Sequence, residues 1–217
     1  MNCCAPTSRA IAGHFDAKVA QGDLQRYKTH GPDKRALRLI GALERLGVHG
    51  RTILDVGSGI GVISLELLKR GAASATLADA SPSYLNAARN EGQALGLADR
   101  LDFVEGDFVN TATRLQTADF VVMDRSVCCY PDWQPLLVAA AKHTSDALAM
   151  TYPRDRLAVR AMIGVENLRR RWAKDDFRAF VHPPRELEAA LQASGLRRVH
   201  RTQTLAWRID IYRRVDA

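Results

Sequence analysis

Residues 54–64 read LDVGSGIGVIS, and this stretch decides the fold. The apolar run 52–56 is typical of a buried parallel strand, and residues 62–70 have a helical pattern. Glycine is required where the backbone turns with positive φ or must approach a ligand without a Cβ. A strand, a glycine turn and a helix place backbone N–H groups against a small ligand. The G-x-G-x-G spacing differs from that of dinucleotide-binding enzymes and of P-loops.

Acidic residues stand at the ends of the next expected strands. Strand 75–79 ends in Asp79, strand 101–105 runs into Gly106 and Asp107, and strand 119–124 ends in Asp124. A carboxylate at the end of the second strand can accept hydrogen bonds from both hydroxyls of a ribose. Each acid alone could be an ordinary turn residue. The ordered set, at the edge where open α/β sheets bind ligands, predicts a binding site.

With these features the chain resembles the class I S-adenosylmethionine-dependent methyltransferases over about residues 33–214. The resemblance implies S-adenosylmethionine (SAM) as cofactor and S-adenosylhomocysteine (SAH) as product. It implies that Asp107 binds the adenine amino group and that Phe108 packs on the ring. Tyr27 could cover the cofactor, as lid aromatics do in related folds, or belong to the core. The full set of cofactor-binding residues predicted in this way is Tyr27, Asp55, Gly57, Ser58, Gly59, Gly61, Asp79, Ala80, Asp107, Phe108 and Asp124.

The fold class is therefore α/β, a Rossmann-like methyltransferase fold with helices on both faces of the sheet. Residues 147–152 are the fifth expected strand. Alternating segments 197–204 and 207–214 predict a terminal hairpin, which completes a seven-stranded, mostly parallel sheet with a C-terminal antiparallel strand. We expect one domain, 1–217, because no repeat or long linker interrupts it. Its expected parts are a helical lid at 1–50, a cofactor-binding core at 51–153, substrate-side helices at 154–196 and the hairpin at 197–214. The expected helices span 15–29, 33–46, 60–70, 82–95, 133–144, 155–173 and 184–194.

The segment 124–132, DRSVCCYPD, is where we expect the chemistry, because it follows the fourth strand. With TYPRDR at 151–156 it resembles, more loosely, small bacterial methyltransferases related to magnesium-protoporphyrin O-methyltransferases. The candidate catalytic residues are Arg125, Tyr130 and His182. Arg125 could bind the cofactor or a substrate carboxylate, or pair with Asp124 or Asp132. Tyr130 could position or deprotonate the acceptor, or pack in its loop.

His182 could act as a base for a hydroxyl or thiol acceptor, although a lone histidine is more often structural. Trp172, Phe177 and Phe180 could line an apolar substrate pocket or belong to the core. The sequence thus leaves open which of these side chains meets the acceptor.

The cysteines form two adjacent pairs, Cys3-Cys4 and Cys128-Cys129, without the C-x₂₋₄-C spacing of structural zinc sites. We therefore expect no metal, and we expect the Cys128-Cys129 pair to pack as small apolar residues. No apolar run approaches the ~20 residues that span a bilayer. The first 15 residues have no hydrophobic signal core, so we expect a cytoplasmic location.

The net charge of +7 lies wholly in residues 151–217, which hold 15 Lys/Arg against 8 Asp/Glu. Residues 1–150 hold 16 of each. Individual arginines could simply belong to a solvated helix face. As a field that attracts an anionic substrate, the charge predicts a small-molecule acceptor that is anionic or carries a carboxylate, and O-methylation of it, with Arg169 and Arg125 as the arginines to test first. A thiol or other soft acceptor, an RNA acceptor, and a non-catalytic cofactor-binding protein are the alternatives. The absence of an N/D-P-P-Y/F motif after the fourth strand argues against a nucleic-acid partner.

Overall fold

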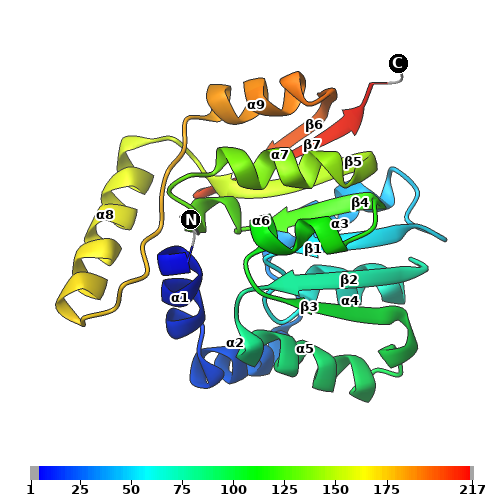
Figure 1. Cartoon of the computed structure of the whole chain (residues 1–217), viewed down its shortest axis with the longest axis horizontal. Helices are drawn as coiled ribbons and strands as arrows, with labels where there is room; N and C mark the ends of the chain where they lie inside the picture. Colours follow the sequence, from blue (N-terminus) through cyan, green and yellow to red (C-terminus); the bar gives the residue numbers. More distant parts are fainter. Residues whose placement is uncertain (1–4, 216–217) are drawn as a thin grey trace.

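The computed structural model describes residues 5–215, with side chains from residue 8, and is built on one seven-stranded sheet (Figure 1). Its strand order is β3-β2-β1-β4-β5-β7-β6. Strands β1 to β5 are parallel, and β7 lies antiparallel between β5 and β6. The strands are β1 (Thr52–Val56), β2 (Ser74–Asp79), β3 (Leu101–Glu105), β4 (Ala118–Asp124), β5 (Thr144–Pro153), β6 (Leu196–Gln203) and β7 (Trp207–Arg214).

Alternation along the strands supplies a core to each face of the sheet. Ile53 of β1 packs in one cluster with the helices α2 to α5, whereas its neighbour Leu54 packs in the other with α7 and α9. Both faces of the sheet are therefore covered, as expected for parallel strands. The α-helices are α1 (Ala5–His14), α2 (Ala17–His30), α3 (Lys34–Glu44), α4 (Val62–Lys69), α5 (Pro82–Ala94), α6 (Phe108–Thr111), α7 (Gln134–Lys142), α8 (Leu157–Trp172) and α9 (Pro184–Ala193).

Three short 3₁₀ segments complete the described chain: η1 (Ala98–Arg100), η2 (Ala112–Arg114) and η3 (Val127–Cys129). The predicted fold class is confirmed: the sheet is mostly parallel and ends in the antiparallel hairpin β6–β7. Helix α1 was not predicted, because its sequence AIAGH has little helical periodicity of its own. The helix is held by Ile11, which packs in the same core cluster as Leu54. None of the helices in residues 5–215 has the length and apolar character needed to cross a bilayer.

Helix α8 differs from the other helices because it stands apart from the sheet at one side of the molecule (Figure 1). Of its side chains, Val159 alone is buried. The segment after it, residues 173–183, runs back past α1 toward α9 (Figure 1). The cavity described below lies between α8, α1 and the carboxyl ends of the strands.

Candidate active site

The glycine turn after β1 has the geometry that the sequence predicted. Gly57, Gly59 and Gly61 have φ of 68°, 56° and 76°, in the region that glycine adopts without strain. A Cβ on Gly57 would lie 2.6 Å from the Cβ of Ser126, and one on Gly61 would lie 2.6 Å from a methyl carbon of Leu77. Glycine is therefore required here by space as well as by backbone conformation.

Asp79 lies at the end of β2, directly beside this turn. Its two carboxylate oxygens accept hydrogen bonds from the N–H groups of Gly59 and Ser81, each at 2.8 Å. Burial raises the pKa of Asp79, although these N–H groups favour the ionised form. Each carboxylate oxygen can accept more than one hydrogen bond, so Asp79 is anchored and still able to bind a ligand hydroxyl.

Asp55 is completely buried under the turn, where its Oδ2 accepts the hydroxyl of Ser64 at 2.7 Å. Its other oxygen, Oδ1, has no hydrogen-bond partner. Burial disfavours the charged carboxylate and raises the pKa of Asp55 to about 7. Asp55 thus supports the floor of the turn and does not line the cavity.

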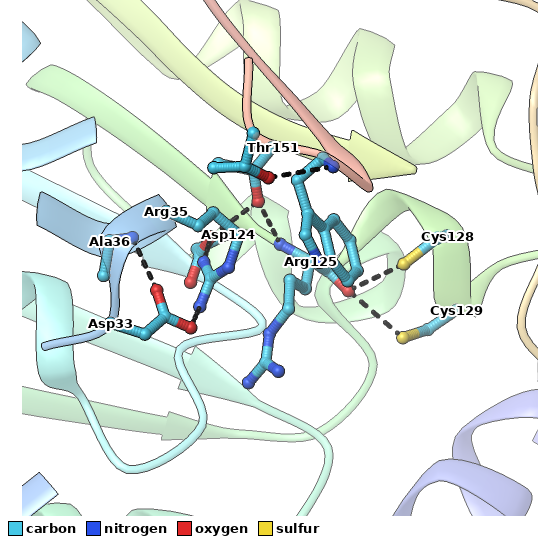
Figure 2. Close-up of polar contacts among 10 residues, drawn as sticks. Asp33, Arg35, Ala36, Asp124, Arg125, Cys128, Cys129 and Thr151 are labelled. Atoms are coloured by element: carbon cyan, nitrogen blue, oxygen red, sulfur yellow. Dashed lines mark hydrogen bonds and ion pairs between the residues drawn. The ribbon is translucent and has the colours of Figure 1, made fainter. Parts of the chain in front are cut away.

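At the end of β4, Asp124 is held by two neighbours (Figure 2). Its Oδ1 is paired with the Arg35 guanidinium and accepts the Thr151 hydroxyl, the latter at 2.6 Å. Arg35 also reaches Asp33, the N-cap of α3, and burial lowers the pKa of the guanidinium to about 10. The partner of Asp124 is therefore Arg35, which the sequence did not single out, and not Arg125.

Arg125 has an unusual backbone for a residue with a side chain, with φ of 59°. Its N–H donates to Thr151 Oγ1 at 3.0 Å, and its carbonyl accepts from the thiols of Cys128 and Cys129 at 3.1 and 3.3 Å. Figure 2 shows the guanidinium extending away from the Arg35–Asp124 pair. Within residues 5–215 it forms no hydrogen bond or ion pair, so the ion pair with Asp124 or Asp132 is not made. Such a strained, anchored arginine is a strong candidate for ligand binding.

The two thiols interact with each other as well as with the Arg125 carbonyl. Their mutual hydrogen bond lowers the pKa of Cys128 and raises that of Cys129. Both cysteines stand free of disulfides, and Cys128 is buried. Cys3 and Cys4 lie outside the described residues. Among residues 5–215, no three His, Cys, Asp or Glu side chains gather where they could hold a metal ion.

One cavity of about 710 Å³ joins the glycine turn to Arg125. Of the predicted site residues, it is lined by Gly57, Gly59, Asp79, Ala80, Phe108, Asp124, Arg125 and Tyr130. Its outer wall comes from α8 and the segment after it, and includes Val159, Met162, Ile163, Arg169, Arg170 and Phe177. The cavity therefore has a polar end at the strand termini and a largely apolar end that carries arginines.

Besides Asp55, two predicted site residues lie away from the cavity lining. Tyr27 is buried against α4, where its hydroxyl donates to Glu66 at 2.8 Å and accepts from Lys69, so the predicted lid position is corrected. Phe15 and Tyr84 line the cavity instead. His182 is buried with its Nε2 3.2 Å from the Val127 carbonyl oxygen, and burial lowers its pKa. It contacts the backbone of the loop 124–132 and does not line the cavity, so its predicted role as a base has no geometric support.

Ser58, Gly61 and Asp107 lie near the cavity without lining it. Ser58 Oγ is buried without a partner, and Gly61 precedes α4. Asp107 caps α6 and also accepts the hydroxyl of Ser8, on α1, at 2.6 Å. Their predicted roles toward the cofactor stay predictions. Of the three aromatic candidates, Phe177 lines the main cavity, Phe180 lines a neighbouring one and Trp172 faces solvent.

Helix α1 closes one side of the cavity and was missed in the sequence. Ile11, His14 and Phe15 line the cavity, and His14 Nδ1 lies 2.6 Å from Asp175 Oδ2. The His14 ring stacks on Phe177 with centroids 4.5 Å apart. The long-range pairing of His14 with Asp175 leaves no mark in the local sequence.

Comparison with known proteins agrees with this geometry. Residues 53–148 match the model of a family described as a methyltransferase domain. The ribosomal protein L11 methyltransferase of Enterobacter sp. (strain 638) is 35% identical over 80 residues, which are 37% of this chain and 26% of that protein. That of Escherichia coli (strain 55989 / EAEC) is 38% identical over 60 residues, 28% of this chain and 20% of that protein. The chain thus spans about a quarter or less of the curated relatives it matches.

Solved structures show the same fold over nearly the whole chain. The magnesium protoporphyrin IX methyltransferase of Synechocystis PCC 6803 with bound SAH has a TM-score of 0.74 at 16% identity, covering 96% of this chain and 100% of that one. An O-methyltransferase family protein from Burkholderia thailandensis has a TM-score of 0.72 at 19% identity, covering 93% and 61%.

Residues 53–148 match a methyltransferase domain, and the sheet with its glycine turn has the fold of the class I SAM-dependent methyltransferases. Within that class, its fold is similar to that of the magnesium protoporphyrin IX methyltransferase.

Proposed function

We propose that this protein transfers a methyl group from SAM to an oxygen of a small, anionic metabolite that carries a carboxylate. The observation that supports the proposal is the single cavity that runs from the glycine turn and Asp79 to the Arg125 guanidinium. One end has the features of the cofactor site of the class. The other end offers a positive charge without an ion pair in the described chain.

The residues at the polar end fit SAM. Gly57 and Gly59 leave the backbone open to a ligand, and Asp79 is positioned to accept the ribose hydroxyls. The predicted contacts of Asp107 and Phe108 with adenine belong to the same proposal. When bound, SAM supplies an electrophilic methyl group for an in-line displacement, so the protein's task is to align the acceptor.

The residues at the outer end fit an acceptor with apolar and anionic parts. Val159, Ile163 and Phe177 provide apolar walls, while Arg125 can hold a carboxylate and Arg169, already paired with Glu166, adds positive charge to the cavity wall. A carboxylate is already ionised at neutral pH, because its ordinary pKa is about 4. It needs no general base, which agrees with the position of His182 outside the cavity lining.

Acceptors of other kinds are distinguished by the labelling experiment described below. The L11 methyltransferase relatives suggest a protein acceptor, but this chain covers at most about a quarter of them. A cavity of about 710 Å³ is in the range of small-molecule sites. Thiol and RNA acceptors are tested beside the metabolite. The predicted cytoplasmic location also stays a prediction.

Cofactor binding is tested by titration calorimetry with SAM and SAH. Asp79→Asn keeps the size of the side chain and removes the charge, so we expect SAM to bind about tenfold or more weakly. The matched control is Asp99→Asn, an exposed acid of η1. Equal affinity in the wild type and Asp79→Asn contradicts the proposed cofactor site.

The acceptor is identified by incubating the protein with methyl-labelled SAM and a metabolite extract, and then with purified ribosomal proteins and RNA. We expect label in an acidic small molecule as a base-labile ester. Label in protein or RNA alone overturns the proposed acceptor but retains the cofactor site. SAM binding without any labelled product supports a non-catalytic protein.

A further inference from the structure

Helix α8 has a second apolar face that nothing in the described chain covers. Leu157, Val165, Leu168 and Trp172 are 87%, 61%, 46% and 75% exposed. Their spacing of 8, 3 and 4 residues places them in one stripe, because successive residues of an α-helix are turned by about 100°. Monomeric proteins rarely expose such a continuous apolar patch without a binding role.

The stripe is bordered by arginines. The 100° rotation places Arg160 and Arg171 along one margin and Arg169 along the other. Glu166 is the one acid of the helix, and it turns toward the cavity, where it pairs with Arg169 and Arg170 at 3.6 and 3.5 Å. Just before the helix, Asp155 pairs with Arg160 at 2.5 Å, so Arg171 is the margin arginine that has no ion pair within residues 5–215. The exposed face of α8 is thus an apolar stripe whose margins are basic and whose neighbouring acids are already paired.

We propose that this face docks α8 on an anionic lipid surface. A helix with a broad apolar face, basic margins and an exposed tryptophan is the signature of a segment that lies in a membrane interface. The arginine stems can follow the apolar stripe while their guanidinium groups reach lipid phosphates. Figure 1 shows α8 standing off from the sheet, so that no other element shields the helix on that side.

The charge of the α8 face favours an anionic lipid surface over a second copy of the chain as its partner. Two α8 helices packed stripe to stripe would bring their arginine margins together, while Asp155 and Glu166 are already paired with arginines of their own helix region. Like charges brought close disfavour that contact. Anionic lipid headgroups neutralise the same margins, each basic group contributing favourably near the surface.

The docked face is continuous with the cavity. Val165 belongs both to the exposed stripe and to the cavity lining, and Met162 lies beside it at the cavity wall. Docking on lipid therefore brings the outer end of the cavity close to the membrane. The docking surface itself does not depend on the proposed methyl transfer.

The test is co-flotation of the protein with vesicles of phosphatidylcholine alone or mixed equally with phosphatidylglycerol. We expect binding to the anionic vesicles, weakened by salt, and little binding to the neutral ones. Leu168→Ser should lower the partition about tenfold. Its control is Leu37→Ser on α3, because the exposed fraction of Leu37, 49%, is similar to the 46% of Leu168. This control variant should bind vesicles as the wild type does.

Charge and tryptophan variants sharpen the test. Arg171→Gln should weaken anionic-vesicle binding about fivefold, while Arg114→Gln, an exposed arginine of η2, should not. Trp172 fluorescence should shift to shorter wavelength on anionic vesicles, and Trp172→Phe should abolish the shift. Melting curves and SAM affinity of all variants should match the wild type, because none of these residues lines the cavity.

Three results would overturn the proposal. The first is equal, weak binding of the wild type to both kinds of vesicle. The second is a dimer in sedimentation that Leu168→Ser converts to monomer, which assigns the face to a second copy. The third is binding to polyglutamate in the absence of vesicle binding, which assigns it to an acidic protein.

Discussion

The two ends of the cavity are built in different ways. At the strand termini, Gly57 and Gly59 shape the site with their backbone, and Asp79 is fixed by N–H groups of the adjacent turn. At the outer end, Arg125 and Arg169 project side chains from a strained loop and from α8. The first end is formed by residues that lie close together in the sequence, between 57 and 81. The second is assembled from distant segments.

This difference fits the two ligands of the proposed reaction. A ligand common to a whole class can be bound by backbone geometry, which varies little once the strand, turn and helix are in place. An acceptor particular to one enzyme must be selected by side chains. Substitutions at the two ends should therefore have different effects. Those at the strand termini should change cofactor affinity and stability, and those at the outer end should change acceptor affinity.

The largest effect is expected for Gly57→Ala. The new Cβ would lie 2.6 Å from Ser126 Cβ at a φ of 68°, so the turn must shift. We expect a loss of about 2–4 kcal/mol in unfolding free energy, a Tm lower by about 2–4 °C for each kcal/mol, and SAM binding at least about tenfold weaker. Calorimetry and thermal melting measure both quantities.

The control for this substitution is Gly164→Ala in α8, where a Cβ meets no atom within 4 Å and φ is ordinary. That variant should be as stable as the wild type or slightly more so, because alanine has the higher helix propensity. If the two substitutions behaved alike, the turn would not be the constrained end of the cavity.

Arg125→Gly should separate acceptor binding from stability. Loss of the guanidinium should raise KM for the acceptor about 10- to 100-fold and leave the SAM affinity within about twofold. The backbone at φ 59° becomes relaxed, so Tm should stay the same or rise. The comparison variant is Arg169→Gln, whose 73% exposed side chain already pairs with Glu166 and should change KM less than about threefold. An unchanged acceptor KM in both variants would leave the basic charge without a role in binding.

Asp55 gives the site a pH-dependent stability. Its pKa is raised from 3.8 to about 7 by burial, so the folded protein binds a proton that the unfolded chain has released. Unfolding free energy should therefore fall as pH rises from about 4 to 7, and this loss should be complete above pH 7. Asp55→Asn should flatten the fall and be more stable than the wild type at pH 8, as measured by urea denaturation. A pH profile identical in both proteins would assign the titration elsewhere.

The smallest effect is expected for Tyr130→Phe. Tyr130 is buried and lines the cavity, and the substitution keeps the ring while removing the hydroxyl. A carboxylate acceptor needs no proton removed, so kcat should stay within about twofold at all pH values. A loss of kcat that grows toward low pH would indicate a phenol or thiol acceptor, with Tyr130 acting on its proton.

The sequence predicted the sheet because its signals are local. The apolar run 52–56, the glycines at 57, 59 and 61, and the acid at 79 each depend on neighbours in the chain, and the strand ends then meet at one edge. Ser81 before Pro82 likewise marked the start of α5, where its Oγ accepts the N–H of Tyr84. The fold class and the glycine turn were predictable for this reason.

Contacts between distant segments decided the rest. Arg35 pairs with Asp124 across 89 residues, His14 pairs with Asp175 across 161, and Tyr27 turns to Glu66 instead of the cavity. No local pattern marks such partners, because a charged or aromatic side chain fits many surroundings equally well. By itself, the sequence determined the parallel sheet and the backbone turn at its edge, where conformation is limited by sterics and hydrogen bonding. Only the tertiary structure decided which side chains close the cavity, because their positions depend on packing between segments far apart in the chain.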